Sequence, residues 1–188
     1  MELRELEFYK TPFGEVMINQ GEGFHIYDIK DREFTCSFIS VLSEMYPDAL
    51  KSLNQMHADK KANIPFMEYR MVKTFIGCNF GNYDQIVDID TLGNFNFEHV
   101  SCPLRGGDCK FEKGDCRICK PKIKTDLSDR EIEVMRLFSE GFDIDQVADK
   151  CFISATTAQT HRRNAFKRAG VHTLAEFIIW AKTNNLFI

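Results

Sequence analysis

The spacing of hydrophobic residues changes along the first hundred positions of the chain. Short runs rich in aromatic and β-branched residues come first, at residues 6–9, 15–18 and 24–29, and turn signals that contain glycine separate them. From Glu33 onward the apolar side chains recur at helical spacing until Pro47 interrupts them. The pattern therefore predicts a small antiparallel meander that is followed by a helix.

Further elements are expected before the end of this region. Asp48 is expected to cap a second, short helix, and a third helix is expected to follow Pro65. Two weaker strand candidates cover residues 86–89 and 95–97. Aromatic residues at helical spacing usually form a core, so residues 1–100 are predicted to be an α+β domain rather than a ligand-binding pocket. A phospho-acceptor receiver domain is disfavoured, because its alternating strands and helices are missing.

Residues 126–188 carry the pattern of four consecutive helices. The first has a capping-box sequence, in which Ser128 can accept a hydrogen bond from the amide of Glu131 while the glutamate side chain reaches back. A short second helix follows, and Ser154 and Gly170 are expected to begin and end a long third helix. A short helix, a tight turn and a longer helix form the layout of a helix-turn-helix, so we predict an all-α four-helix domain of this kind.

The third of these helices combines an apolar face with a basic one. No Asp or Glu occurs between Asp149 and Glu176, whereas the same stretch holds five Lys and Arg residues. In a chain of net charge -4, this local reversal favours contact with phosphate groups. The positions expected in the core are Thr157, Ala158, His161, Ala165 and Ala169.

Charge is also distributed unevenly over the whole chain. Residues 1–100 hold 16 acidic and 9 basic side chains, so this domain offers a poor surface for nucleic acid. Residues 101–125, a cysteine-rich loop and basic linker, hold 3 acidic and 7 basic side chains. Four bases without an acid lie between Arg117 and Lys124, which fits either a solvated linker or contact with a phosphate backbone.

The composition disfavours several classes of protein. Hydrophobic residues make up 44% of the chain, which is enough for a packed core and argues against general disorder. No apolar run approaches the ~18 residues that a membrane span needs, and the N-terminus lacks the pattern of a secretory signal. We therefore expect a cytoplasmic protein. An enzyme is not expected, because the carboxylates of Asp84, Asp88 and Asp90 lack a convergent nucleophile and base.

The cysteine-rich loop is a candidate metal site. Cys116 and Cys119 have the C-x2-C spacing of one side of a structural zinc site, and nearby glycines allow tight loops. Cys78 is a substitute ligand if Cys119 points away, whereas Cys36 and Cys151 are expected to be small core residues. Reduced thiols without metal and an iron–sulfur cluster remain alternatives, and disulfides are not expected in a cytoplasmic chain. The expected zinc ligands are Cys102, Cys109, Cys116 and Cys119.

The last third of the sequence resembles the LuxR/GerE-type DNA-binding domain. Residues 127–188 agree with that family in the order and spacing of many positions. Ala158 and Ala169 depart from it, since bulkier aliphatic residues are usual there, and Gln159 stands where a lysine is common. The positions that carry the resemblance are Leu127 to Glu131, Gly141, Val147, Ala148, Ile153, Ser154, Thr157, His161, Asn164, Gly170 to His172, Ala175 and Glu176.

The resemblance implies that the third helix enters the major groove of double-stranded DNA. His161 then lies on the inner face, and Arg168 lies too far round the helix for contact. The last helix is the usual dimerisation surface of the family, which implies a homodimer on paired half-sites. The residues implied to face base edges are Gln159, Thr160 and Arg163, and those implied to contact phosphates are Ser154, Thr156, Arg162 and Lys167.

The whole chain also resembles helix-turn-helix regulators of Bacteroidota and their phages. Those proteins carry the strings Cys-Asn-Phe-Gly, Phe-Asn-Phe-Glu and Cys-Pro-Leu-Arg-Gly, which stand here at residues 78–81, 95–98 and 102–106. The sequence is thus interpreted as a sequence-specific DNA-binding transcriptional regulator. The alternative is a zinc-stabilised protein-interaction module whose helix-turn-helix does not bind DNA, which the acidic N-terminal half and Gln159 favour.

Overall fold

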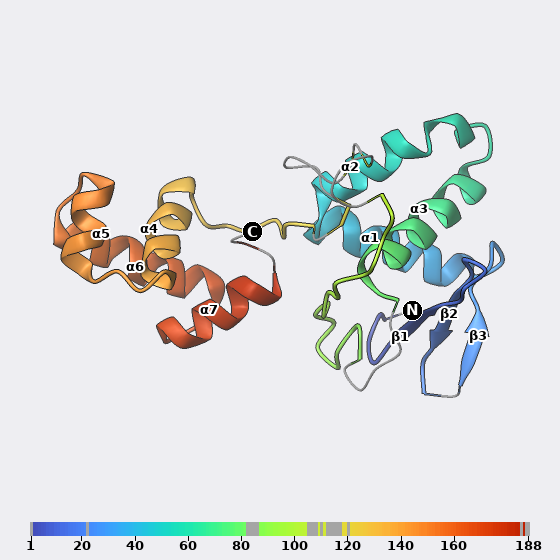
Figure 1. Ribbon diagram of the computed structural model, residues 1–188, viewed down its shortest axis with the longest axis horizontal. Coiled ribbons are helices and arrows are strands. Elements are labelled where there is room, and N and C mark those ends of the chain that lie inside the picture. Colours follow the sequence, from blue (N-terminus) through green and yellow to red (C-terminus); the bar gives the residue numbers. More distant parts are fainter. Residues whose placement is uncertain are drawn as a thin grey trace. The chain divides into compact units, whose positions relative to one another are not determined.

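The chain divides into two compact units, Met1–Lys124 and Thr125–Ile188, and each has its own hydrophobic core (Figure 1). None of the described helices is long and apolar enough to cross a membrane. The computed structural model describes residues 2–21, 23–81, 87–104, 109, 111, 118–119, 121–184 and 186.

The N-terminal unit begins with the predicted antiparallel meander. Its strands pair in the order β1 (Glu7–Lys10), β2 (Val16–Asn19) and β3 (Phe24–Ile26). Phe8 lies opposite Ile18 and both are buried, because residues that are directly paired across two strands point to the same face of the sheet. All three residues of β3 are exposed.

Helices follow the sheet, and their ends are set by local sequence. Asn63 caps α3, and its side chain accepts a hydrogen bond from the amide of Phe66. The expectation that Asp48 caps α2 is wrong, because Pro47 is itself the first residue of that helix and Tyr46 precedes it. Proline suits this position since the missing amide would have no helical partner. The helices are α1 (Arg32–Met45), α2 (Pro47–Met56), the 3-10 turn η1 (Ala58–Lys60) and α3 (Ile64–Asn79).

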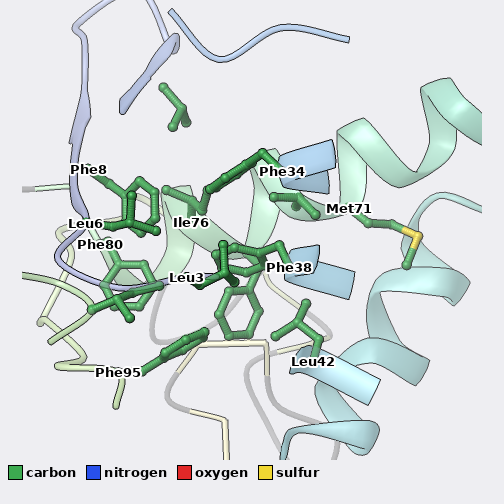
Figure 2. Close-up of a cluster of buried hydrophobic side chains, with 14 of the residues drawn as sticks. Leu3, Leu6, Phe8, Phe34, Phe38, Leu42, Met71, Ile76, Phe80 and Phe95 are labelled. Atoms are coloured by element: carbon green, nitrogen blue, oxygen red, sulfur yellow. The ribbon is translucent and has the colours of Figure 1, made fainter. Parts of the chain in front are cut away.

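Aromatic side chains make up much of the core of this unit (Figure 2). Phe38 of α1 is fully buried, and its ring centroid lies 5.6 Å from that of Phe95 and 5.7 Å from that of Phe75. A third neighbour, Phe8, lies at 6.2 Å. Tilted and edge-on rings at these distances attract one another beyond the effect of burial alone. The core therefore joins β1, α1, α3 and the segment that follows α3.

The two weaker strand candidates form no strands within the described residues. Ile89 makes single antiparallel bridges to Leu6 and to Phe95, and Ile86 lies outside the described residues. The amides of Leu6 and Ile89 each donate to the carbonyl of the other at 3.0 Å. The bridge between Leu6 and Ile89 thus adds one residue pair to the N-terminal segment, and the second bridge lies within residues 89–95.

The aspartates of this region have structural roles where the structure describes them. Asp88 is buried and accepts a hydrogen bond from the amide of Phe8 at 2.7 Å. Asp90 organises a turn, because its carboxylate accepts hydrogen bonds from the amides of Leu92 and Asn94. Asp84 lies outside the described residues.

The expectation that Cys36 is a core residue is wrong, because it lies on the exposed side of α1. Its neighbour Thr35 is buried instead, and the Thr35 hydroxyl lies 2.7 Å from the hydroxyl of Tyr27. Burial raises the pKa of Tyr27 above its usual range, so this pair stays neutral. Cys151, in the C-terminal unit, is buried as predicted.

The C-terminal unit consists of the four predicted helices. Its core takes Val134 and Met135 from the first helix, Val147 from the second, Ala158 from the third and Phe177 from the fourth, and all five are fully buried. The helices are α4 (Asp129–Ser139), α5 (Ile144–Cys151), α6 (Ala155–Ala169) and α7 (Leu174–Thr183).

Candidate nucleic-acid interface

A tight turn connects α5 to α6. Phe152 ends α5 in the left-handed conformation, with φ of 54°, and its side chain is 95% exposed. The amide of Ile153 then donates to the carbonyl of Ala148 at 3.0 Å. The guanidinium of Arg130 on α4 donates to the carbonyl of Cys151. These contacts use the free carbonyls at the end of α5 and so fix the direction in which α6 begins.

The ends of α6 agree with the sequence prediction. Ser154 accepts a hydrogen bond from the amide of Thr157 at 3.1 Å, and Gly170 ends the helix with φ of 69°. The expectation that Thr157 lies in the core is wrong, since the residue is exposed. Its hydroxyl lies 2.8 Å from the Ser154 hydroxyl, so Thr157 contributes to the cap instead.

The inward face of α6 is formed by small side chains. Ala158 and Ala165 have no exposed surface, and His161 and Ala169 are half-buried. An alanine on this face lets the axis of α6 approach the neighbouring helices more closely than a bulkier aliphatic residue would. The departure from the family pattern at Ala158 is therefore accommodated within the core.

The outward face of α6 collects the side chains that the resemblance assigns to DNA. Within the part of the chain that the structure describes, the side chains of Gln159, Arg163 and Lys167 make no hydrogen bond or ion pair. The Thr160 hydroxyl donates to the carbonyl of Thr156 at 2.9 Å and keeps its own oxygen free to accept. Residues three or four positions apart share one face of a helix, which brings this set together. The exposed members are Thr156, Gln159, Thr160, Arg163 and Lys167.

Arg162 differs from these residues, because its side chain packs against aromatic rings of the C-terminal unit. Its guanidinium carbon is 5.1 Å from the ring centroid of Phe138 on α4 and 5.3 Å from that of Phe166. A planar guanidinium can stack on aromatic rings and still present its edge to another group. Arg162 also lines a shallow groove along α6 together with Arg163 and Lys167.

Arg168 is held by an ion pair on the inner side of α6, in agreement with the expectation that it lies away from the DNA-facing residues. Its Nη1 atom lies 2.5 Å from Oε2 of Glu131, and the Glu131 residue is only 2% exposed. The same nitrogen donates to the carbonyl of Asp126 at 3.1 Å. Glu131 also completes the predicted capping box of α4, since its Oε2 accepts from the amide of Ser128 at 2.8 Å. The ion pair thus joins the end of α6 to the start of α4.

Helix α7 has one buried and one exposed side. Phe177 is fully buried, whereas Ile179 is 65% exposed and Trp180 is half-buried. A capping box begins the helix, in which Glu176 accepts hydrogen bonds from the amides of His172 and Thr173. These backbone bonds hold the pKa of Glu176 below its usual value.

The expected zinc ligands are described only in part. Cys119 is buried, and Cys102 and Cys109 are half-buried, whereas Cys116 lies outside the described residues. Among the residues that are described, no three His, Cys, Asp or Glu side chains are already placed to hold a metal ion. The thiol of Cys78 is hydrogen-bonded to that of Cys119.

The structure also describes only part of the basic linker. Arg117 and Lys120 lie outside the described residues. Lys122 and Lys124 are exposed, and the amide of Lys124 donates to the carbonyl of Met45 at 2.7 Å, which attaches this part of the linker to α1.

Residues 125–181 match the family described as bacterial regulatory proteins, luxR family. The match begins at the first residue of the C-terminal unit and includes α4, α5, α6 and most of α7. These residues therefore form a LuxR-family domain, as the resemblance predicts.

Curated relatives match the same part of the chain. The Fimbriae Z protein of Salmonella typhimurium is 33% identical over 60 residues, which are 32% of this chain and 29% of that protein. The virulence factors transcription regulator BvgA of Bordetella pertussis is 35% identical over 60 residues, with the same shares. The chain thus covers less than a third of the length of these relatives. No solved structure matches it significantly.

Proposed function

We propose that this protein is a sequence-specific transcriptional regulator that places α6 in the major groove of double-stranded DNA. The outward face of α6 carries the proposal. It presents polar and basic side chains without a carboxylate, and those of Gln159, Arg163 and Lys167 have no competing partner among the described residues. The two relatives named above are similar to this chain over the same domain, and one of them, BvgA, is named as a transcription regulator.

The base-reading residues are Gln159, Thr160 and Arg163. A glutamine amide can form two hydrogen bonds with adenine, and a guanidinium can form two with the O6 and N7 atoms of guanine. Thr160 can accept or donate at a base edge, or contact a thymine methyl group. Each good pair contributes about 1–3 kcal/mol of discrimination against the wrong base.

The residues proposed to bind phosphates come from the start of α6 and from its later turns. Ser154 and Thr156 are at the N-terminus of α6, where the free amides and the helix dipole attract an anion. Arg162 and Lys167 supply positive charge farther along the helix. Contacts of this kind fix the register of the protein on DNA without reading the sequence.

A homodimer through α7 completes the proposal. The side chain of Ile179 is 65% exposed on the outer side of α7, and Trp180 beside it is half-buried. Two copies joined by this surface would read paired half-sites, whose separation follows from the symmetry of the dimer.

Salt dependence separates this proposal from the protein-interaction module. If each subunit of a dimer neutralises two phosphates through Arg162 and Lys167, the logarithm of affinity should fall with the logarithm of salt at a slope of about -4. A flat profile would favour the interaction module.

Selection of bound sequences from a random DNA pool tests the proposal as a whole. The purified full chain should enrich a defined sequence that contains two related half-sites. Recovery of unrelated sequences after repeated rounds would contradict sequence-specific binding.

A further inference from the structure

The turn between α5 and α6 holds a phenylalanine that is unfavourable in two respects. Phe152 is 95% exposed, and its backbone has a φ of 54°, in the left-handed region. Helices that end in this conformation usually have glycine there, because any other side chain brings its Cβ atom too close to the next carbonyl oxygen. Phe152 thus combines backbone strain with an apolar ring in water.

The residues around Phe152 hold its side chain outside the core. Cys151 is buried, and Ile153 packs against the core of the unit. The amide of Phe152 donates to the carbonyl of Asp149 at 3.2 Å, and that of Ile153 donates to the carbonyl of Ala148 at 3.0 Å. These hydrogen bonds fix the backbone of the turn, so the ring is exposed as a consequence of the fold.

Neither property helps the C-terminal unit to fold. A glycine at this position would fit the backbone better and would expose no apolar surface. Where a residue departs from local rules without a gain in the folded state, a role in binding is expected.

The surroundings of Phe152 favour DNA over a protein partner. In the described part of the C-terminal unit, the other exposed large apolar side chain is Ile179, on α7. A protein interface needs a contiguous apolar patch, whereas the exposed residues two positions on either side of Phe152 are Lys150 and Ser154. The sequence from Phe152 to the residue before Glu176 also contains no carboxylate that would repel phosphates.

We propose that Phe152 packs against the 5-methyl group of a thymine in the major groove. This inference rests on the proposed function, in which the N-terminus of α6 enters that groove, because the turn that holds Phe152 directly precedes this N-terminus. Thymine is the base that presents a methyl group in the major groove, and phenylalanine is among the side chains that contact it.

The contact removes apolar surface of both partners from water. Because the turn is already held by its own hydrogen bonds, binding orders no flexible segment. Phe152 therefore adds a thymine to the bases that each half-site presents to Gln159, Thr160 and Arg163.

Uracil in place of thymine tests this contact, because the two bases differ only in the methyl group. Each thymine of the selected DNA site is replaced in turn by deoxyuridine, and the affinities of the unaltered chain and of Phe152→Gly are compared. Replacement of the contacted thymine should weaken binding of the unaltered chain about fourfold per half-site, which is the effect of one carbon group removed from water. Phe152→Gly should bind both forms of the site equally, and Phe152→Leu should retain the preference for thymine.

The melting temperature separates a binding role from a structural one. Phe152→Gly should not lower the melting temperature of the C-terminal unit, because glycine suits the left-handed backbone and the exposed ring adds little to the packing. Phe13→Gly is the matched control, since Phe13 is 92% exposed in the N-terminal unit. This control should respond to deoxyuridine as the unaltered chain does.

The inference is overturned if the unaltered chain binds every deoxyuridine site as tightly as the thymine site, or if Phe152→Gly keeps the full preference for thymine. Equal weakening of Phe152→Gly on specific and unrelated DNA would indicate a contact with deoxyribose and would also overturn it. Unchanged DNA binding together with lost regulation of transcription would indicate a protein partner instead. If the unaltered chain selects no DNA sequence, the proposed function fails, and this inference with it, before any variant is compared.

Discussion

Removal of the Arg168 side chain should destabilise the C-terminal unit, although Arg168 is only one of several cations on α6. Glu131 is 2% exposed, and its Oε2 atom accepts hydrogen bonds from the Ser128 amide, the Ser128 hydroxyl and Arg168. Arg168→Ala leaves this buried carboxylate with two neutral donors and no opposite charge. Breaking a buried ion pair from one side costs about 3–5 kcal/mol.

The expected loss is smaller here, because the Arg168 side chain is 43% exposed and water can replace part of its interaction. Two donors also remain on Glu131. We therefore expect the free energy of unfolding to fall by about 2 kcal/mol. For a domain of this size, that loss lowers the melting temperature by about 10 °C.

Tryptophan fluorescence can follow this unfolding in the full chain. Trp180 is the single tryptophan, and its ring centroid lies 5.4 Å from that of Phe177 in the core of the C-terminal unit. Its signal therefore reports this unit and not the N-terminal one, which matters because two units need not unfold in one step.

Arg163→Ala is the matched control for this measurement, because Arg163 is exposed on the same helix. It should change the free energy of unfolding by less than about 0.5 kcal/mol. Equal stabilities of Arg168→Ala and Arg163→Ala would refute the structural role of the ion pair. A double-mutant cycle with Glu131→Gln would then show no coupling between the two positions.

Two further predictions concern α6 and α7. Lys167→Ala should weaken binding to all DNA sequences alike. It should also reduce the slope of log affinity against log salt by about 1 per lost phosphate contact, and salt titrations on specific and unrelated DNA measure both effects. Because backbone amides hold the pKa of Glu176 below its usual value, the folded chain binds this proton less readily than the unfolded chain. The stabilisation by Glu176 is therefore present at neutral pH and lost as the pH falls through that lowered pKa. Unfolding in acid, followed by Trp180 fluorescence, should depend less on pH in Glu176→Gln.

Local sequence signals predicted the parts of the fold that depend on neighbouring residues. Ser128 with Glu131 begins α4, and Ser154 and Gly170 bound α6, because caps involve residues only a few positions apart. The same locality explains the error at Thr157. Helical spacing places this residue near the inner face, but a hydroxyl in the first turn can bond to the cap residue and remain exposed.

Long-range contacts could not be predicted in this way. The ion pair between Glu131 and Arg168 joins residues 37 positions apart, and no local pattern indicates it. The hydrogen bond from the Asn79 side chain to the carbonyl of Ile118 likewise joins residues 39 positions apart. The prediction for Cys36 was wrong for the same reason. Thr35, not Cys36, contacts Tyr27, and the sequence of α1 alone does not show which of the two adjacent residues faces the core.

The affinity of Arg163→Ala for the selected DNA site tests the central claim most directly. Competition binding should compare this variant with the unaltered chain on the selected site, on the same site with its guanines replaced, and on unrelated DNA. We predict a loss of about 1–3 kcal/mol on the selected site, with much less discrimination against the replaced guanines. Unchanged affinity and unchanged discrimination would contradict the claim that the outward face of α6 reads DNA sequence.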